Sequence, residues 1–141
     1  MTHFVTVLIS DADEAFRQMV HQTLAMAEGV HVVGVTDCVN ETLELAHLLQ
    51  PDAILLNAAL LNGDAARAAE AGLFTACKVL LVSEAGTEAH TLQLLQLGAR
   101  GCLVKGEGLL EKLPEAIRTI QRGEAVLSPR LTGWMLDTLR Q

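Results

Sequence analysis

Four polar side chains stand at or just after the ends of short apolar runs: Asp11, Asn57, Ser83 and Lys105. A carboxylate and an ammonium group, with an amide and a hydroxyl nearby, are groups that can bind a cation and a phosphate ester. The runs before Asn57 and Ser83 are continuous, such as AILL before Asn57, and all four runs are short. We therefore interpret these runs as buried strands of a parallel sheet, whose carboxyl ends bring the four side chains to one crevice.

Five such strands alternate with segments of helical periodicity. The predicted strands cover residues 4–10, 31–36, 53–57, 78–83 and 101–105, and the predicted helices cover residues 13–28, 40–50, 65–71, 87–97 and 109–122. Asn40 is predicted to cap the second helix, since asparagine favours that position. Five β-then-α units predict a doubly wound, five-stranded parallel α/β sheet with right-handed crossovers and helices on both faces.

A further amphipathic helix follows the five units. Ser128 and Pro129 are typical of a helix start, and apolar residues then recur at helical spacing from Leu131 to Leu139. We divide the chain into a domain at residues 1–124 and a linker or extra helix at residues 125–141. The apolar stripe of this helix either covers the flank of the domain, mediates dimers or leads into a further domain.

Composition favours one packed domain, since 50% of the 141 residues are hydrophobic and 19% are charged. No apolar run approaches the roughly 18 residues of a membrane helix, and the N-terminus has no basic leader, so we predict a cytosolic protein without membrane contact. The three cysteines lack CxxC spacing and are predicted to be reduced thiols.

Acidic residues predominate, and the net charge of -7 disfavours nucleic-acid binding by this chain itself. Residues 1–66 hold nine acids and one base, whereas residues 67–141 hold eight acids and nine bases. The acidic half contains Asp11 and Asn57, which suits a cation better than an anion.

The spacing of Asp11, Asn57, Ser83 and Lys105, with PDxxLL before the third strand and GARGCLVK around the fifth, resembles the receiver domain of two-component response regulators. The resemblance covers essentially the whole chain and implies a flavodoxin-like (CheY-like) fold. The segment RGEAVLSPRLTGWMLDTL further resembles the connection to the helix-turn-helix domain in the NarL/LuxR-type subfamily.

The resemblance implies a role for each of these positions. In that family an aspartate at the position of Asn57 receives a phosphoryl group from a histidine kinase, using Mg²⁺ held by acids after the first strand. A hydroxyl matching Ser83 and a lysine matching Lys105 contact the phosphoryl group.

This chain departs from the family pattern at the acceptor and at the metal site. An amide cannot form the acyl phosphate, so Asn57 marks a degenerate acceptor position. Ala12 replaces the usual second acid, so Asp11 is the one expected metal ligand and Mg²⁺ binding is predicted to be weak or absent. Asp13 and Glu14 are interpreted as exposed acids that begin the following helix.

Two further departures lie nearby. Leu60 and Leu61 stand where the family has a Met-Pro pair, and Cys102 stands at the position of the aromatic switch residue. Several departures in one site favour a naturally degenerate receiver over a single engineered change.

Three functions follow from these residues. The first is an atypical receiver, without enzyme activity and without aspartyl phosphate, that controls a transcriptional output through protein contacts. The second is a phosphate-ester enzyme using Asp11 and Lys105, which the absence of a glycine-rich phosphate loop disfavours. The third is a sensor that binds a small molecule at the vacated pocket.

The partners expected of the first function are a second copy of the chain and a histidine kinase or other signalling protein. Nucleic acid would be bound only through a DNA-binding domain outside this chain. The predicted homodimer surface lies in the second half, where Leu94, Leu97 and Leu103 neighbour three bases: Arg100, Lys112 and Arg118.

Overall fold

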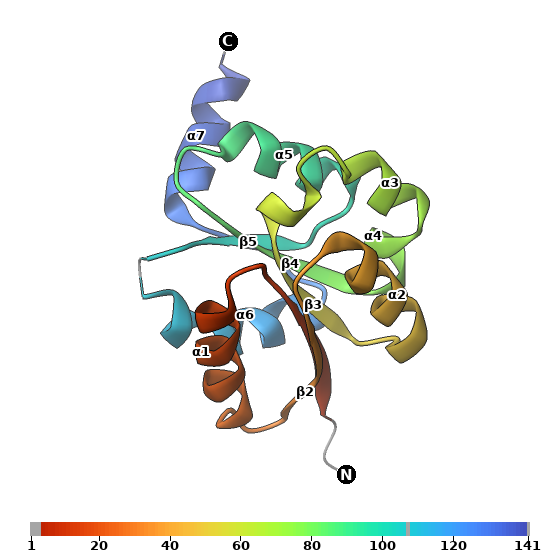
Figure 1. Cartoon of the computed structure of the whole chain (residues 1–141). Coiled ribbons are helices and arrows are strands. Elements are labelled where there is room, and N and C mark those ends of the chain that lie inside the picture. The colour runs from red at the N-terminus through yellow and green to blue at the C-terminus, as the bar shows by residue number, and fades with distance from the viewer. Residues whose placement is uncertain (1–3, 107, 141) are drawn as a thin grey trace.

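The structure, a computed structural model, describes residues 4–106 and 108–140. A parallel sheet in the order β2-β1-β3-β4-β5-β6 lies between two layers of helices (Figure 1). Its strands are β1 (Val5–Ser10), β2 (Val30–Thr36), β3 (Ala53–Asn57), β4 (Lys78–Ser83), β5 (Gly101–Val104) and β6 (Val126–Leu127). The predicted doubly wound α/β fold is confirmed.

Two layers of helices cover the two faces of the sheet. One layer contains α1 (Glu14–Ala25) and α6 (Leu109–Gln121). The other contains α2 (Val39–Leu49), α3 (Ala65–Glu70), α4 (Leu73–Ala76), α5 (Glu88–Leu97) and α7 (Pro129–Leu139), with a 3-10 turn, η1 (Ala58–Leu61). None of these described helices is long and apolar enough to cross a bilayer.

Strand residues alternate between the two cores, as the two-residue period of a strand requires. Ile54 and Leu56 of β3 face the α2 and α5 side, whereas Ala53 and Leu55 face α1 and α6. All four are at most 2% exposed. Because β3 is buried on both faces, its sequence shows a continuous apolar run.

A sixth strand corrects the prediction of five. Residues Val126 and Leu127 pair in parallel with Gly101 and Cys102 of β5. Two residues give no periodic signal, so their pairing could not be recognised in the sequence. The pairing depends on Gly101, because a Cβ atom there would lie 2.5 Å from the carbonyl oxygen of Val126.

One helix prediction was wrong in detail, and one short helix was missed. Asn40 does not cap α2: the N-cap residue is Cys38, and the Asn40 side chain instead accepts a hydrogen bond from Arg67. The short helix α4 was not predicted, because its four residues, LFTA, are fewer than the periodicity needs. By contrast, Ser128 caps α7 by accepting a hydrogen bond from the Leu131 backbone, as expected.

Of the three leucines predicted for a dimer surface, two are buried and one is exposed. Leu94 and Leu103 are buried in the core, at 0% and 5% exposed, because α5 and β5 turn these side chains toward the sheet interior. They cannot form an exposed apolar contact. Leu97, at the end of α5, is 36% exposed.

Replacing Gly101 with alanine is expected to destabilise the protein by about 1–3 kcal/mol, because the new methyl group would meet the backbone of Val126. Chemical denaturation measures the change. Gly133→Ala in α7 is the matched control: a Cβ there meets nothing within 4 Å, and alanine is expected to stabilise the helix by about 0.5–1 kcal/mol. Equal effects of the two substitutions would contradict the role of Gly101.

Candidate functional site

The carboxyl ends of β1, β3, β4 and β5 meet at one edge of the sheet. Ser10 is in register with Leu56, Asn57 with Val82, and Ser83 with Val104. The residue after each of β1 and β5 continues the hydrogen bonding to a neighbouring strand: the backbone nitrogen of Asp11 donates to the carbonyl oxygen of Thr36 in β2, and that of Lys105 donates to the carbonyl oxygen of Ser83 in β4. The predicted convergence of strand ends is therefore present.

The Asp11 carboxylate lies at the centre of this edge and is 2% exposed as a residue. Its Oδ2 atom accepts a hydrogen bond from Asn57 Nδ2 at 3.0 Å and lies 3.4 Å from Lys105 Nζ. Its Oδ1 atom accepts from the backbone nitrogen of Asp13 at 2.9 Å. Three donors thus surround one buried carboxylate, which satisfies its charge within the protein.

Asn57 is oriented by a second hydrogen bond. While Nδ2 donates to Asp11, Oδ1 accepts from the backbone nitrogen of Ala59 at 2.9 Å and so caps η1. Only the amide meets both demands at once, because a carboxylate has no hydrogen to donate toward Asp11.

Lys105 is held from three directions. Besides Asp11, its Nζ atom lies 3.9 Å from Glu84 Oε1 and 4.2 Å from the centre of the Phe16 ring. A cation over an aromatic face is a favourable contact. Glu84 and Phe16 were not predicted as site residues. Glu84 directly follows β4, so the strand-end rule could have found it, whereas the place of Phe16 depends on how α1 packs.

Ser83 and Cys102 form a separate pair beside this group. Both are buried, and Ser83 Oγ lies 3.2 Å from Cys102 Sγ. Burial raises the pKa of the Cys102 thiol, although hydrogen bonding with Ser83 and Thr91 opposes the rise. The structure therefore brings Asp11, Asn57 and Lys105 into direct contact and joins Ser83 to Cys102.

The residues present do not fit a Mg²⁺ site. Both oxygens of Asp11 are already bound to donors, and Asn57 turns its Nδ2 toward that carboxylate. The Asp13 carboxylate caps α1 by accepting from the Phe16 backbone at 3.2 Å, as the prediction of a helix-starting acid requires. A hard cation needs several free oxygen ligands, which this arrangement does not offer.

The chain matches the model of the response regulator receiver domain over residues 7–118. The response regulator GacA of Pseudomonas aeruginosa is 32% identical over 129 residues, 90% of this chain and 60% of GacA. NarL of Mycobacterium tuberculosis, named a probable transcriptional regulatory protein, is 32% identical over 139 residues, 97% of this chain and 64% of NarL. The chain thus spans less than two thirds of these curated relatives.

Solved structures agree with this fold. The NarL receiver domain superposes with a TM-score of 0.76 at 31% identity, covering 86% of this chain and 99% of that domain. The RcsB receiver domain of Salmonella enterica serovar Typhimurium gives 0.81 at 18% identity, covering 94% and 98%. The family match and these relatives establish that the chain belongs to the receiver domain family of response regulators.

Proposed function

We propose that this receiver domain transmits signals through protein contacts without forming an aspartyl phosphate. The observation that carries the proposal is the hydrogen bond from Asn57 Nδ2 to Asp11 Oδ2. The acceptor position holds an amide, which is not a nucleophile, and its Nδ2 group stabilises the neighbouring carboxylate by a hydrogen bond.

Lys105 supports the same proposal. Its ammonium group lies 3.4 Å from Asp11 and supplies the positive charge that the buried carboxylate needs. Protein groups alone therefore balance the charge of the Asp11 carboxylate. Ser83 is engaged with Cys102, and this buried thiol offers no ring to rotate at the predicted switch position.

The output and partners are inferred from the relatives. RcsB has been solved as dimers bound to DNA, and NarL is named a probable transcriptional regulatory protein. We infer a transcriptional output reached through a DNA-binding domain outside this chain, with a histidine kinase or other signalling protein upstream. The cytosolic location and the division at residues 124 and 125 stay predictions.

The other two functions gain no support from the site. An enzyme acting on phosphate esters needs a free nucleophile or metal, and Asp11 is occupied on both oxygens. A sensor at the vacated pocket would have to displace the same hydrogen bonds.

Incubation with acetyl phosphate and Mg²⁺ is expected to add no phosphate to the protein. Asn57→Asp alone is expected to restore little labelling, because its carboxylate would face Asp11 without enough cation charge between them. Adding Ala12→Asp supplies the second acid and is expected to restore labelling. Intact-mass spectrometry measures the added phosphoryl group in each form.

The matched control combines Ala12→Asp with Asn62→Asp. It adds the same two negative charges as the Ala12→Asp, Asn57→Asp variant, but the second carboxylate lies at the far end of η1 and not at the acceptor position. This control is expected to stay unlabelled. Labelling of the unmodified protein would overturn the proposed function, and an unlabelled but folded Ala12→Asp, Asn57→Asp variant would overturn the assignment of the site.

Mg²⁺ affinity is expected to rise from the unmodified protein to the variant with both acids restored. Isothermal titration is expected to show weak or no binding to the unmodified protein, because Asp11 is its one well-placed carboxylate and already has three donors. The variant carrying Ala12→Asp and Asn57→Asp is expected to bind at least tenfold more tightly. Tight binding by the unmodified protein would mean that Asp13 or Glu14 leaves its place at the start of α1 to coordinate the ion.

Self-association remains our expectation, now with α7 as the exposed element. Leu136 and Leu139 are 53% and 78% exposed. Replacing both with serine is expected to shift sedimentation at tens of micromolar toward monomer, because apolar contact area is lost. Leu48→Ser, on α2 and 70% exposed, between the values of Leu136 and Leu139, is the control. Monomer for the unmodified protein at low and moderate salt would contradict the expectation.

A further inference from the structure

The loop that carries Asn57 is joined to α5 by a histidine. His90 lies in the first turn of α5 and is half-buried, and its Nε2 atom lies 3.0 Å from the carbonyl oxygen of Ala58, the residue after Asn57. Because a carbonyl oxygen can only accept a hydrogen bond, the imidazole donates from Nε2. The contact joins η1 to a helix residue 32 positions further along the chain.

The peptide group between Ala58 and Ala59 is held at both of its polar atoms. Its N–H group, that of Ala59, donates to Asn57 Oδ1 at 2.9 Å, and its carbonyl group, that of Ala58, accepts from His90. The N–H and C=O groups of one trans peptide unit point in opposite directions within a fixed plane. Rotation of this peptide unit would therefore break both hydrogen bonds together.

Asn57 extends this arrangement to the centre of the site. His90 donates to the peptide unit, the peptide unit donates to Asn57, and Asn57 Nδ2 donates to Asp11 Oδ2 at 3.0 Å. Each of the two amide groups accepts at its oxygen and donates at its nitrogen, and hydrogen bonds in such a chain polarise and strengthen one another. An aspartate at position 57 would break the chain, because a carboxylate has no hydrogen to donate to Asp11.

The first turn of α5 has a second polar contact. Thr91, the next residue, is 1% exposed and hydrogen-bonds the thiol of Cys102, the residue at the predicted switch position. Cys102 Sγ in turn lies 3.2 Å from Ser83 Oγ. One turn of helix is thus held both to the loop after Asn57 and to strand β5.

Helix α5 packs in turn against α7. The two helices are in contact and lie side by side in Figure 1, and α5 also contacts η1. Leu61 of η1, Leu94 of α5 and Leu131 of α7 belong to one core cluster and are each at most 2% exposed. Because closely packed side chains transmit small displacements, a shift of α5 reaches α7.

We propose that this chain of hydrogen bonds, from Asp11 through Asn57 to His90, couples protein contacts at the Asn57 edge of the sheet to α7. While the chain is intact, η1 and α5 are held together. A protein partner that binds this edge and rotates the Asn57 amide breaks the chain, and α5 and α7 are released to move. The inference rests on the proposed function, because it names the route by which a receiver without aspartyl phosphate passes on a contact.

Hydrogen exchange followed by mass spectrometry tests the His90 link. In His90→Leu, exchange in η1, α5 and α7 is expected to become about five- to tenfold faster relative to α1, because one hydrogen bond is lost. Helix α1 lies on the other face of the sheet and corrects for any change in global stability. In His90→Gln, whose amide nitrogen can donate in place of Nε2, most of the protection is expected to return. Acceleration equal to that of α1, or no rescue by glutamine, would overturn the coupling.

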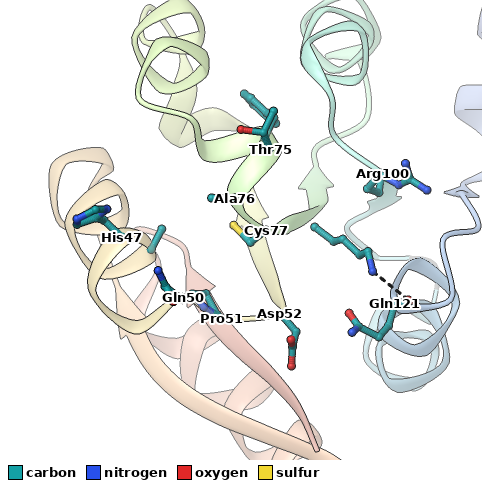
Figure 2. Close-up of a pocket in the computed structure, with 12 residues that line it drawn as sticks. His47, Gln50, Pro51, Asp52, Thr75, Ala76, Cys77, Arg100 and Gln121 are labelled. Carbon is teal, nitrogen blue, oxygen red and sulfur yellow. Dashed lines mark hydrogen bonds between the residues drawn. The ribbon is translucent and has the colours of Figure 1, made fainter.

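His47→Leu is the matched control. His47 is exposed on α2, and Figure 2 shows it with Gln50 and Pro51 near the amino end of β3, the opposite end of that strand from Asn57. This substitution removes the same side chain but touches no link of the chain, so exchange in η1, α5 and α7 is expected to stay unchanged. Acceleration of these elements equal to that in His90→Leu would overturn the role of His90.

A double-mutant cycle tests whether Asn57 and His90 act together. Asn57→Ala removes both hydrogen bonds of the Asn57 amide and is expected to speed exchange in α5 and α7 about fivefold when His90 is present. In the His90→Leu background, where the chain is already broken, the same change is expected to have no further effect on these helices. The same factor in both backgrounds would overturn the coupling.

Nitrogen-15 NMR of the unmodified protein tests the chain without any substitution. The His90 ring is expected to carry a proton on Nε2, and the hydrogen bond to Ala58 is expected to slow the exchange of this proton with water. A ring protonated on Nδ1 alone would overturn the proposal. Phosphorylation of the unmodified protein by acetyl phosphate would overturn the proposed function but would leave this tautomer unchanged, so the two can fail separately.

Discussion

The parallel hydrogen-bond ladder of β1, β3, β4 and β5 is the constraint on which the site depends. The central residues of these strands are buried on both faces, so a slip in register would expose apolar side chains or bury polar ones. The register places Ser10 beside Leu56 and Asn57 beside Val82. The polar residues at or just after these strand ends, Asp11, Asn57 and Lys105, must then lie in one crevice at the carboxyl edge of the sheet.

Within that crevice, the Asp11 carboxylate determines what its neighbours do. A nearly fully buried negative charge is unfavourable unless donors surround it. In this chain Asn57, Lys105 and the Asp13 backbone provide those donors. An aspartate at position 57 would instead add a second negative charge and require a cation. The amide therefore changes the electrostatics of the whole site as well as removing the nucleophile.

The sequence predicted the fold and the place of the site because both depend on strong local signals. Continuous apolar runs identified the buried strands, and polar residues at their ends identified Asp11, Asn57 and Lys105. Features that depend on packing between distant segments were missed. The pairing of Val126 with Gly101 and the contact of Phe16 with Lys105 join residues far apart in the chain.

Predictions from residue type also failed where one residue could take either of two structural roles. Asn40 is a residue type that often caps helices. Its side chain instead accepts a hydrogen bond from Arg67 of α3, and this tertiary contact outweighs the local preference. Leu94 and Leu103 are apolar residues next to bases, yet both belong to the core. Neither residue type nor charged neighbours reveals which side of an element faces the sheet.

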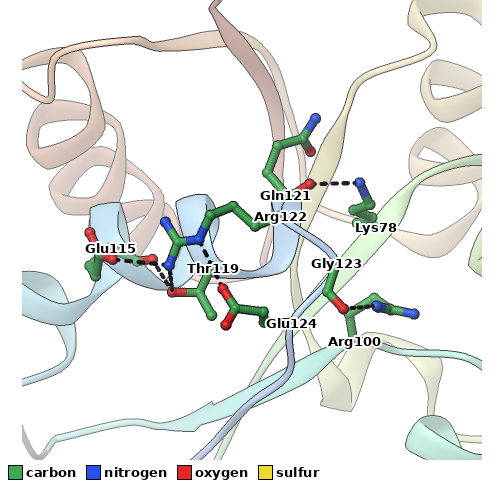
Figure 3. A network of polar contacts seen from close by, with 8 residues as sticks. All are labelled: Lys78, Arg100, Glu115, Thr119, Gln121, Arg122, Gly123 and Glu124. Atoms are coloured by element: carbon green, nitrogen blue, oxygen red, sulfur yellow. Dashed lines mark hydrogen bonds and ion pairs between the residues drawn. The ribbon is translucent and has the colours of Figure 1, made fainter.

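The two ends of the sheet differ because all of its crossover helices run in the same sense. Helix C-termini, which carry partial negative charge, gather at the amino ends of the strands. Lys78 and Arg100 bind the carbonyl groups at the end of α6 and offset that charge (Figure 3). At the carboxyl ends, where helix N-termini gather, the acid Asp11 is the central group. The sheet thus has Lys78 and Arg100 on helix carbonyl groups at one end and the group of Asp11, Asn57 and Lys105 at the other, so a domain whose acceptor position holds an amide still has two chemically distinct ends.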